Sequence, residues 1–437
     1  MQVYRHVLPP SEKLNFLQLL ATQFGVQGEA VKSAVDKWQQ GEASAEDWDG
    51  EVMLRSADRL QQACQPLYSS LFTPISNQPG GIKFLLDLRA DVLDAIHAQP
   101  GHSAHLHVLS ERIRRSLAEW FSLGMLQLER ITWEQSSAAL LQKVMRYEAV
   151  HHIQGWDALR LRLLPNRRVY AFFHPSLPDE PLVLLHTALT DHVAASMPEV
   201  LEQEASQELA YEHAARQATT AVFYSVSSTQ AGLAGVDLGN FLIKQVAHQL
   251  QKDLPNIRTL VTLSPMPNFR RWLLTQLQKE KQQAMAQSKQ HERGERLLTL
   301  GEERALSQHA QEAASLSVSP YYRALDELEG LLDSDNLLAN AEAEAIMQPV
   351  LMRLAACYLL KERRRQLALD PVANFHLRNG AMLYALRWRA DLSAQGLRRS
   401  WGIMVNYKYL LEDVQSNNRA YLVDNVIHAS DAVKALL

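Results

Sequence analysis

The histidine at position 376 lies in a segment whose residue types suit proton transfer. The segment reads Asp-Pro-Val-Ala-Asn-Phe-His-Leu-Arg-Asn-Gly-Ala (370–381), and its proline is expected to end the helical run before it. Asn379 and Gly380 are turn formers, so we predict that His376 lies on a short loop between packed elements. A histidine held there can pass a proton near neutral pH. The alternative is a buried histidine that only satisfies its own hydrogen bonds.

A serine at position 264 follows an apolar run that reads as a strand, residues 257–263. Pro265 and Pro267 hold the chain directly after it. Ligands of open α/β sheets gather beyond the carboxyl ends of parallel strands, so the hydroxyl is placed to bond a substrate carboxylate or carbonyl. The alternative is a cap for the next helix, a role that Asn268 fills as well. No Gly-x-Ser-x-Gly elbow surrounds Ser264, which argues against a hydrolase serine.

A glycine-rich stretch, Gln-Ala-Gly-Leu-Ala-Gly-Val-Asp-Leu-Gly-Asn (230–240), is the third candidate. Its glycines permit positive φ angles, and the helix that follows directs its first N–H groups at the loop. The helix dipole favours an anion there, which makes the stretch a candidate phosphate site. The spacing matches neither the Walker pattern nor the Rossmann fingerprint. It resembles the pyrophosphate loop of GNAT-type acyltransferases, which binds coenzyme A; a tight structural turn explains it about as well.

The elements that must position these residues differ between the two parts of the chain. Residues 1–147 read as helices joined by short turns, and Leu85, Leu88, Val92 and Ile96 recur near helical spacing. No cluster of ionisable groups forms an obvious site in this part. We therefore predict an all-helical bundle used for packing or oligomerisation.

After residue 150 the pattern changes to short β-rich runs, and we predict strands at 168–173, 182–190, 220–226 and 257–263. A loop and a helix separate the third strand from the fourth, so these two should be parallel. Residues 276–311 are rich in Gln, Lys, Glu, Arg and Ala, which predicts a charged, exposed helical insertion with breaks at Gly294 and Gly301. The predicted fold class is α+β in two domains, a helical one at 1–147 and a mixed α/β one at 148–437.

Composition narrows the class of protein. A chain of 437 residues is long for one core, and a net charge of −4 gives no electrostatic reason to expect nucleic acid. Cys64 and Cys357 lie far apart, and no histidine pair has metal-ligand spacing with a carboxylate, so we predict no metal. No apolar run reaches the ~18–20 residues that span a bilayer, and no signal peptide is recognisable. We expect a cytoplasmic protein with no membrane partner.

Motifs spread over residues 150–410 resemble those of malonyl-CoA decarboxylases. Two features depart from the family: a Ser-Lys-Leu tail is missing, and the charged stretch after Leu277 is longer than in animal members. Both features concern the cellular location and the surface of the protein rather than its chemistry. The matching motifs, in order, are His-Pro-Ser (174–176), Glu-Pro-Leu (180–182), His-x-Ala-Leu-Thr (186–190), Phe-Tyr-Ser (223–225), Gly-Leu-x-Gly-Val-Asp-Leu-Gly (232–239), Leu-Ser-Pro (263–265), Asp-Pro-Val-Ala-x-Phe-His-Leu (370–377) and Asn-Tyr (406–407).

The resemblance implies a GNAT-like (acyl-CoA acyltransferase-like) catalytic domain that converts malonyl-CoA to acetyl-CoA and CO2, within fatty-acid metabolism. It implies that Ser264 engages the malonyl carboxylate as proton acceptor and that His376 donates a proton to the enolate. No cofactor is implied, because the thioester is itself the electron sink. Family members are oligomeric, which implies a homo-oligomer (dimer or tetramer) formed through the helical domain. The implied coenzyme A contacts are the backbone groups of Ala234, Gly235, Val236, Asp237, Leu238, Gly239 and Asn240, and further candidates for lining the site are His174, Asn379 and Tyr407.

Two other functions fit parts of the sequence. A GNAT-type acyltransferase would need a carboxylate base near the acyl group, and no carboxylate is placed for that role. A non-catalytic acyl-CoA sensor would be stabilised by its ligand without turnover. The first leaves Ser264 and His376 unexplained, and the second gives residues 370–381 no purpose beyond packing.

Overall fold

The computed structural model describes residues 1–44, 50–99, 101, 103–121, 126–148, 150–201, 208–236, 242–285, 296–310, 319–333 and 340–437. These residues belong to two compact units. Unit 1 consists of Met1–Ile153, Tyr170–Leu184 and Val226–Leu238, and unit 2 of Gln154–Val169, Leu185–Ser225 and Gly239–Leu437. Each unit is thus built from several stretches of the chain, and the division at residues 147 and 148 stays a prediction.

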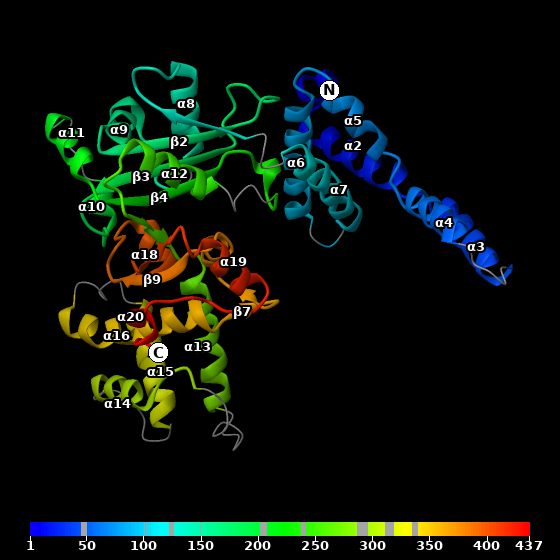
Figure 1. Cartoon of the computed structure of the whole chain (residues 1–437). Helices are drawn as coiled ribbons and strands as arrows, with labels where there is room; N and C mark the ends of the chain where they lie inside the picture. The colour runs from blue at the N-terminus through cyan, green and yellow to red at the C-terminus, as the bar shows by residue number, and fades with distance from the viewer. Residues whose placement is uncertain are drawn as a thin grey trace. The chain divides into compact units, whose positions relative to one another are not determined.

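Unit 1 is mainly helical, as the periodicity of its apolar residues predicted. In α6 (Gly81–Ala98) the four residues expected on one face, from Leu85 to Ile96, are all buried. Helix α7 (Ala104–Trp120) packs against α6, and α3 and α4 lie side by side (Figure 1). The other helices are α1 (Gln2–His6), α2 (Pro10–Gln23), α3 (Gly28–Ser44), α4 (Gly50–Ala63), α5 (Ser69–Ser76) and α8 (Ala138–Tyr147).

One strand interrupts the region predicted to be all helical. It is β1 (Gln127–Ile131), which lies beside β2 at the edge of the sheet. The strand has only five residues, and three of them are polar, so its periodic pattern is too weak to be recognised from the sequence. It also depends on the neighbouring strand for its hydrogen bonds. After this strand α8 begins at Ala138, where the Ser137 side chain accepts a hydrogen bond from the N–H of Leu140 at 3.2 Å.

The mixed sheet has the strand order β1-β2-β3-β4-β5-β10-β6, with β9 paired to β10. Four strands form where they were predicted: β2 (Arg167–Phe173), β3 (Val183–Thr190), β4 (Thr220–Ser228) and β5 (Thr259–Thr262). β4 and β5 are parallel and α12 (Leu242–Asp253) lies between them in sequence, which confirms the predicted crossover. Three unpredicted strands, β6 (Ser264–Pro265), β9 (Met382–Arg387) and β10 (Met404–Lys408), pair antiparallel. The predicted class, helical and then mixed α/β, is confirmed.

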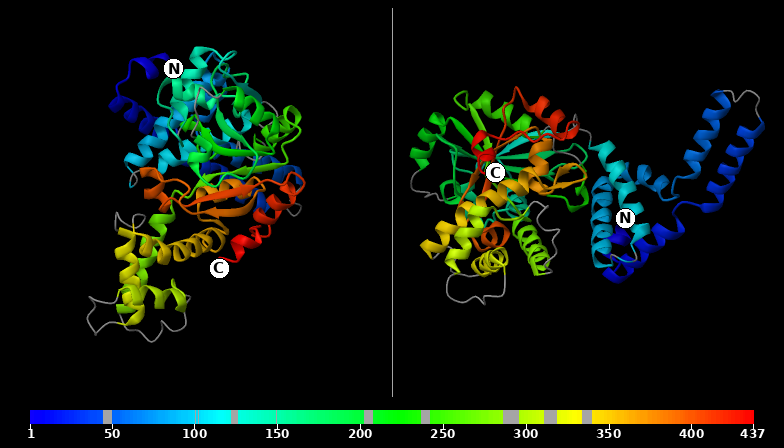
Figure 2. Two further views of the ribbon diagram at one scale, coloured as in Figure 1. Left: turned by 90° about the vertical axis from the view of Figure 1, so that its left-hand side faces the viewer. Right: turned by 90° about the horizontal axis from the view of Figure 1, so that it is seen from below.

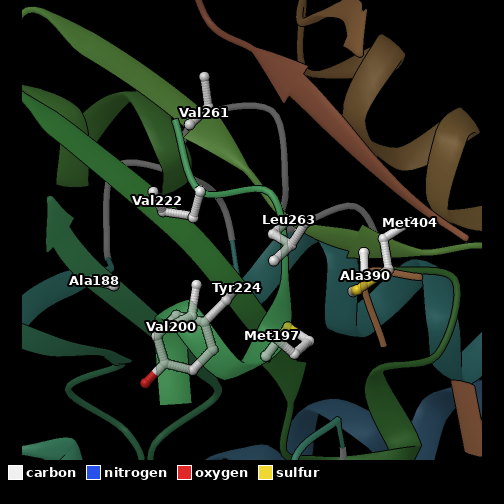
Figure 3. Close-up of a cluster of buried hydrophobic side chains, with 10 residues drawn as sticks. Ala188, Met197, Val200, Val222, Tyr224, Val261, Leu263, Ala390 and Met404 are labelled. Carbon is white, nitrogen blue, oxygen red and sulfur yellow. The ribbon is translucent and has the colours of Figure 1, made fainter. Parts of the chain in front are cut away.

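The pleat of β5 and β6 sends alternate side chains to opposite faces of the sheet. On one face Val261 and Leu263 enter a buried apolar cluster closed by α10 (Met197–Leu201). Thr262 and Ser264 alternate with them and therefore face the other side, where the candidate site lies. Figure 3 shows the cluster, whose other members are Ala188, Ala194, Met197, Val200, Val222, Tyr224, Ala390 and Met404.

The charged stretch at 276–311 is mostly helical where the structure describes it, with residues 296–299 outside any helix, and it is packed rather than wholly exposed. Helix α13 (Phe269–Met285) continues into it, and α14 (Leu300–His309) lies beside α15 (Pro320–Asp333) (Figure 2). Leu306 is fully buried. The break predicted at Gly301 was wrong: this glycine lies in the first turn of α14, which Thr299 and Glu302 begin with a capping box. Gly294 lies outside the described residues.

Helix α16 (Ala341–Leu360), within the described part of the chain, is long and apolar enough to cross a membrane by length and composition alone. Half of its most apolar window is buried inside the structure, and its Arg353 pairs with Glu302 of α14 at 2.6 Å. These are the contacts of a core helix. The remaining elements of unit 2 are α9 (Gly155–Arg162), α11 (Glu208–Gln217), β7 (Arg363–Arg364), β8 (Leu367–Ala368), α17 (Pro371–Arg378), α18 (Ala394–Ser400), α19 (Val414–Leu422) and α20 (Asp431–Lys434).

Candidate active site

Ser264 and His376 lie within hydrogen-bond distance of each other in unit 2. The serine Oγ is 3.0 Å from Nε2 of the histidine, and both side chains are buried, with 5% and 4% of their surface exposed. Ser264 belongs to β6, where it pairs with Val405 of β10. His376 belongs to the last turn of α17. A strand pairing and a helix therefore bring together two residues that we predicted for one site.

His376 lies on a helix, and the loop that we predicted for it was wrong. The Asp370 side chain accepts hydrogen bonds from the N–H groups of Val372 and Ala373, each at 2.9 Å, and so caps α17. Pro371 occupies the first helical position, where no N–H is needed, so this proline starts a helix. The prediction that it ends the helix before it was wrong, because α16 ends at Leu360 and β7 and β8 lie between. The predicted turn at Gly380 is present, with φ +79° directly after the helix.

Two tyrosines hold the imidazole ring of His376. The hydroxyl of Tyr409 lies 2.8 Å from Nδ1, and the ring of Tyr407 stacks on the imidazole at a centroid distance of 4.5 Å and an angle of 24°. Burial lowers the pKa of His376 to about 3, because the charged ring would lose the water that stabilises it. The histidine is therefore neutral at neutral pH.

Thr262 and Tyr409 extend the hydrogen-bonded chain, and neither was among the predicted site residues. The Ser264 hydroxyl donates to Thr262 Oγ1 at 2.9 Å, and the same oxygen accepts the N–H of Tyr407 at 3.1 Å. The period of two along a strand places Thr262 on the same face as Ser264, and Tyr409 stands two residues after Tyr407. This alternation was the available signal.

Asp370, at the start of α17, has a buried carboxyl group with a raised pKa. Its side chain is fully buried and accepts a hydrogen bond from the Tyr358 hydroxyl at 3.1 Å. Burial raises the pKa of Asp370 to about 6, although its hydrogen bonds favour the charged form. The carboxyl orients the helix that carries His376 and titrates within the physiological range.

The three further candidates lie in different surroundings. The Tyr407 hydroxyl is buried and has no hydrogen-bond partner among the residues that the structure describes. Asn379 follows α17, and its Nδ2 donates to the Phe375 carbonyl at 2.7 Å, so this side chain secures the helix end. His174 belongs to unit 1, where Nδ1 accepts the N–H of Ser176 at 3.1 Å. Their roles in lining the site stay predictions.

The glycine-rich stretch begins in unit 1 with a short 3-10 helix, η4 (Ala231–Leu233). The N–H groups of Ala234 and Val236 donate to carbonyls within the loop, at 3.1 and 2.8 Å. Gly235 has a φ of +72°, a conformation that favours glycine. Asp237, Leu238, Gly239 and Asn240 lie outside the described residues, so the coenzyme A contacts stay a prediction.

Potential metal ligands do not gather around these residues: within the described ranges, no group of three or more His, Cys, Asp or Glu side chains could hold a metal ion.

Two family models match almost the whole chain. The model of the malonyl-CoA decarboxylase N-terminal domain matches residues 24–121, and the model of the malonyl-CoA decarboxylase C-terminal domain matches residues 124–437.

Curated proteins and solved structures agree with these matches. The chain is 37% identical over 433 residues to the mitochondrial malonyl-CoA decarboxylase of Anser anser anser, covering 99% of this chain and 81% of that protein. It is 38% identical over 435 residues to the mouse protein of the same name, covering 99% and 83%. Among solved structures, the malonyl-CoA decarboxylase of Rhodopseudomonas palustris superposes with a TM-score of 0.78 at 35% identity, over 99% of this chain and 92% of that one. That of Agrobacterium vitis gives 0.76 at 33%, over 98% and 91%. The chain belongs to the malonyl-CoA decarboxylase family.

Proposed function

We propose that this chain is a carboxy-lyase that converts malonyl-CoA to acetyl-CoA and CO2, and that Ser264 and His376 perform the chemistry. Membership of the family supports the overall reaction. The observation that carries the assignment of residues is the 3.0 Å approach of Ser264 Oγ to His376 Nε2, with both side chains buried. A serine and a neutral histidine in such a contact can bind a carboxylate and move a proton.

The first step breaks the bond between the malonyl carboxylate and its α-carbon. The Ser264 hydroxyl bonds the carboxylate and orients it so that the breaking bond overlaps the thioester π system. CO2 leaves, and the electron pair passes to the thioester carbonyl as an enolate. The thioester itself accepts these electrons, and we therefore propose that the reaction uses no cofactor.

The second step returns a proton to the enolate carbon, and we assign this proton to His376. The Ser264 hydroxyl donates to Thr262, so its oxygen can accept a hydrogen bond from Nε2; we therefore assign the proton of the neutral ring to Nε2, with the Tyr409 hydroxyl as donor to Nδ1. A thioester enolate carbon is a stronger base than deprotonated imidazole, so a neutral ring is acidic enough to protonate it. The product is acetyl-CoA, and the deprotonated ring takes a proton from water before the next turnover, so each cycle consumes one proton from solvent.

The backbone groups of residues 234–240 are proposed to hold the phosphates of coenzyme A. We further propose a homo-oligomer formed through the helical region and a cytoplasmic location, although the curated relatives are named as mitochondrial. Light scattering of the purified protein and imaging of the tagged protein in its own cells test these two points.

The test is acetyl-CoA formation from malonyl-CoA by the purified protein, beside folded Ser264→Ala and His376→Ala variants. Two exposed residues of unit 2 give matched controls, Ser416→Ala and His213→Ala. Turnover that collapses only in the first two variants supports the proposal. Full turnover in His376→Ala would overturn the proton donor. Malonyl-CoA that raises the melting temperature without turnover would indicate a sensor, and acetyl transfer to amines would indicate an acyltransferase.

A further inference from the structure

A buried arginine of α6 holds the start of the glycine-rich loop. Only 4% of the surface of Arg89 is exposed. Its guanidinium donates from Nη1 to the carbonyl of Gly232 at 2.5 Å and from Nη2 to the carbonyl of Ala234 at 2.7 Å. Its Nε donates to the carbonyl of Ser110, on α7, at 3.2 Å. One side chain thus joins two helices of unit 1 to the loop.

These hydrogen bonds decide which way the peptide groups of the loop point. The Nη1 of Arg114 approaches the Gly235 carbonyl at 3.4 Å, so three loop carbonyls point toward arginines of α6 and α7. In a trans peptide the N–H points opposite to the C=O. Since the Ala234 carbonyl points at Arg89, the N–H of Gly235 points away from it. Within the described part of the chain, this N–H has no backbone acceptor.

The close approach of α6 to the loop leaves no space for another arrangement. A Cβ added at Gly232 would lie 2.0 Å from the carbonyl oxygen of Leu86 on α6. The loop can therefore lie against this helix only because residue 232 is a glycine, and Arg89 occupies the position one turn further along α6. Helix α6 and the loop are therefore in direct contact and joined by hydrogen bonds.

Among the described residues Arg89 forms no ion pair with a carboxylate, and its hydrogen bonds go to carbonyls. Glu111 of α7 acts on Arg89 only through its charge, and its ion pairs are with Arg114 at 2.7 Å and with Arg115 at 3.2 Å. Burial lowers the pKa of Arg89, but a guanidinium stays protonated at neutral pH. A buried, unpaired positive charge directly behind a loop attracts an anion to the far side of that loop.

We infer that Arg89 is a positioning residue for the diphosphate of coenzyme A: it turns the loop carbonyls away from the ligand and places a positive charge behind the loop. This inference rests on the proposed function in that the loop must bind coenzyme A. It also gives the helical region a part in substrate binding, beyond packing and oligomerisation.

The experiment compares two thioesters in the wild-type protein and in Arg89→Met. Malonyl-CoA carries the diphosphate, whereas malonyl-pantetheine carries the same reacting group without it. Arg89→Met removes hydrogen bonds from a charged donor to the loop carbonyls. We therefore expect the KM for malonyl-CoA to rise about tenfold or more, and the Kd for coenzyme A, measured by calorimetry, to rise by a similar factor. The kcat for malonyl-CoA and the kcat/KM for malonyl-pantetheine should stay within about threefold of the wild type. The control is Arg55→Met, which removes an equal charge from an exposed pair on α4.

Each outcome has a definite meaning. An equal loss of kcat/KM with both thioesters, or an unchanged Kd for coenzyme A, would overturn the inference. If Arg89→Met does not fold, Arg89→Lys decides, because one ammonium group cannot bond both carbonyls in the same geometry. Wild-type affinity for coenzyme A in the folded lysine variant would also overturn it. If the wild-type protein binds coenzyme A but does not decarboxylate malonyl-CoA, the proposed function fails while the calorimetry still tests Arg89.

Discussion

The Oγ of Ser264 lies 3.0 Å from the Nε2 of His376, although 112 residues separate them in the chain. Strand β10 makes this approach possible: Val405 pairs with Ser264, and Tyr407 and Tyr409 hold the imidazole from the same stretch of chain. Any change that displaces β10 should therefore affect both residues at once. The serine and the histidine should behave as one functional unit.

Replacement of both residues should be little worse than replacement of the histidine alone. His376→Ala removes the proton donor and should lower kcat by about 10³-fold, whereas Ser264→Ala should lower it by about 10–100-fold. Residues that act as a unit have non-additive effects, so the double variant should match His376→Ala within about threefold. Steady-state kinetics of the three variants test this. A double variant whose loss equals the product of the single losses would show that the residues act independently.

Tyr409→Phe should disturb the tautomer of His376 without removing any catalytic group. The variant deletes the hydroxyl that lies 2.8 Å from Nδ1 and leaves the ring packed against Phe223. Either ring nitrogen can then carry the proton, and kcat should fall about 10-fold while KM changes little. The nitrogen chemical shifts of His376 should report the mixed tautomers. Tyr322→Phe on α15 is the control; a kcat for Tyr409→Phe equal to that of this control would contradict the prediction.

The sequence sufficed for those parts of the fold that local patterns determine. The unit β4, loop, α12 and β5 was predictable because apolar runs and turn residues alternate there at close spacing. Strand β10 was not, because Met-Val-Asn-Tyr-Lys forms a strand only when β5, β6 and β9 supply partners from distant parts of the chain. A tertiary pairing of this kind has no local signature.

In the candidate site, too, some residues could be predicted from local sequence and others depend on tertiary contacts. Ser264 and His376 were identified from their motifs, but their partners Thr262 and Tyr409 depend on which face of a strand meets α17. Arg89 carries a signal in the sequence, since this charged residue follows Leu85 by four positions on the apolar face of α6. A buried arginine needs partners, and the search for them would have led to the loop carbonyls.

The difference in stability between Asp370→Asn and the wild type should change with pH, because the variant lacks one carboxyl group that titrates. The pKa of Asp370 is raised from 3.8 to about 6 in the folded protein. Between these values the unfolded chain loses the proton and the folded protein keeps it, so stability falls as pH rises. Above pH 6 the buried charge costs the folded protein about 3 kcal/mol, from about 1.4 kcal/mol per pH unit. Asparagine still caps α17 but does not titrate.

The melting temperature of Asp370→Asn, relative to the wild type, should therefore be higher at pH 7.5 than at pH 4.5, by several degrees (on the order of 2–4 °C per kcal/mol). His376 also lowers the stability of the folded protein as the pH falls, because burial lowers its pKa. This effect is equal in the wild type and in Asp370→Asn, so it cancels in the comparison. A difference in melting temperature that is the same at both pH values would show that Asp370 is ionised throughout.

Gly232→Ala should separate the loop from α6 and weaken the binding of coenzyme A. The new methyl group would meet the Leu86 carbonyl oxygen at 2.0 Å, and neither backbone can yield without breaking the hydrogen bonds of Arg89. We expect the Kd for coenzyme A to rise at least about tenfold, since two charge-assisted hydrogen bonds are strained. The control is Gly330→Ala on α15, where a Cβ would meet nothing within 4 Å. That variant should bind coenzyme A normally and gain about 1 kcal/mol of helix stability. Normal affinity in folded Gly232→Ala would mean that the loop binds its ligand without resting on α6.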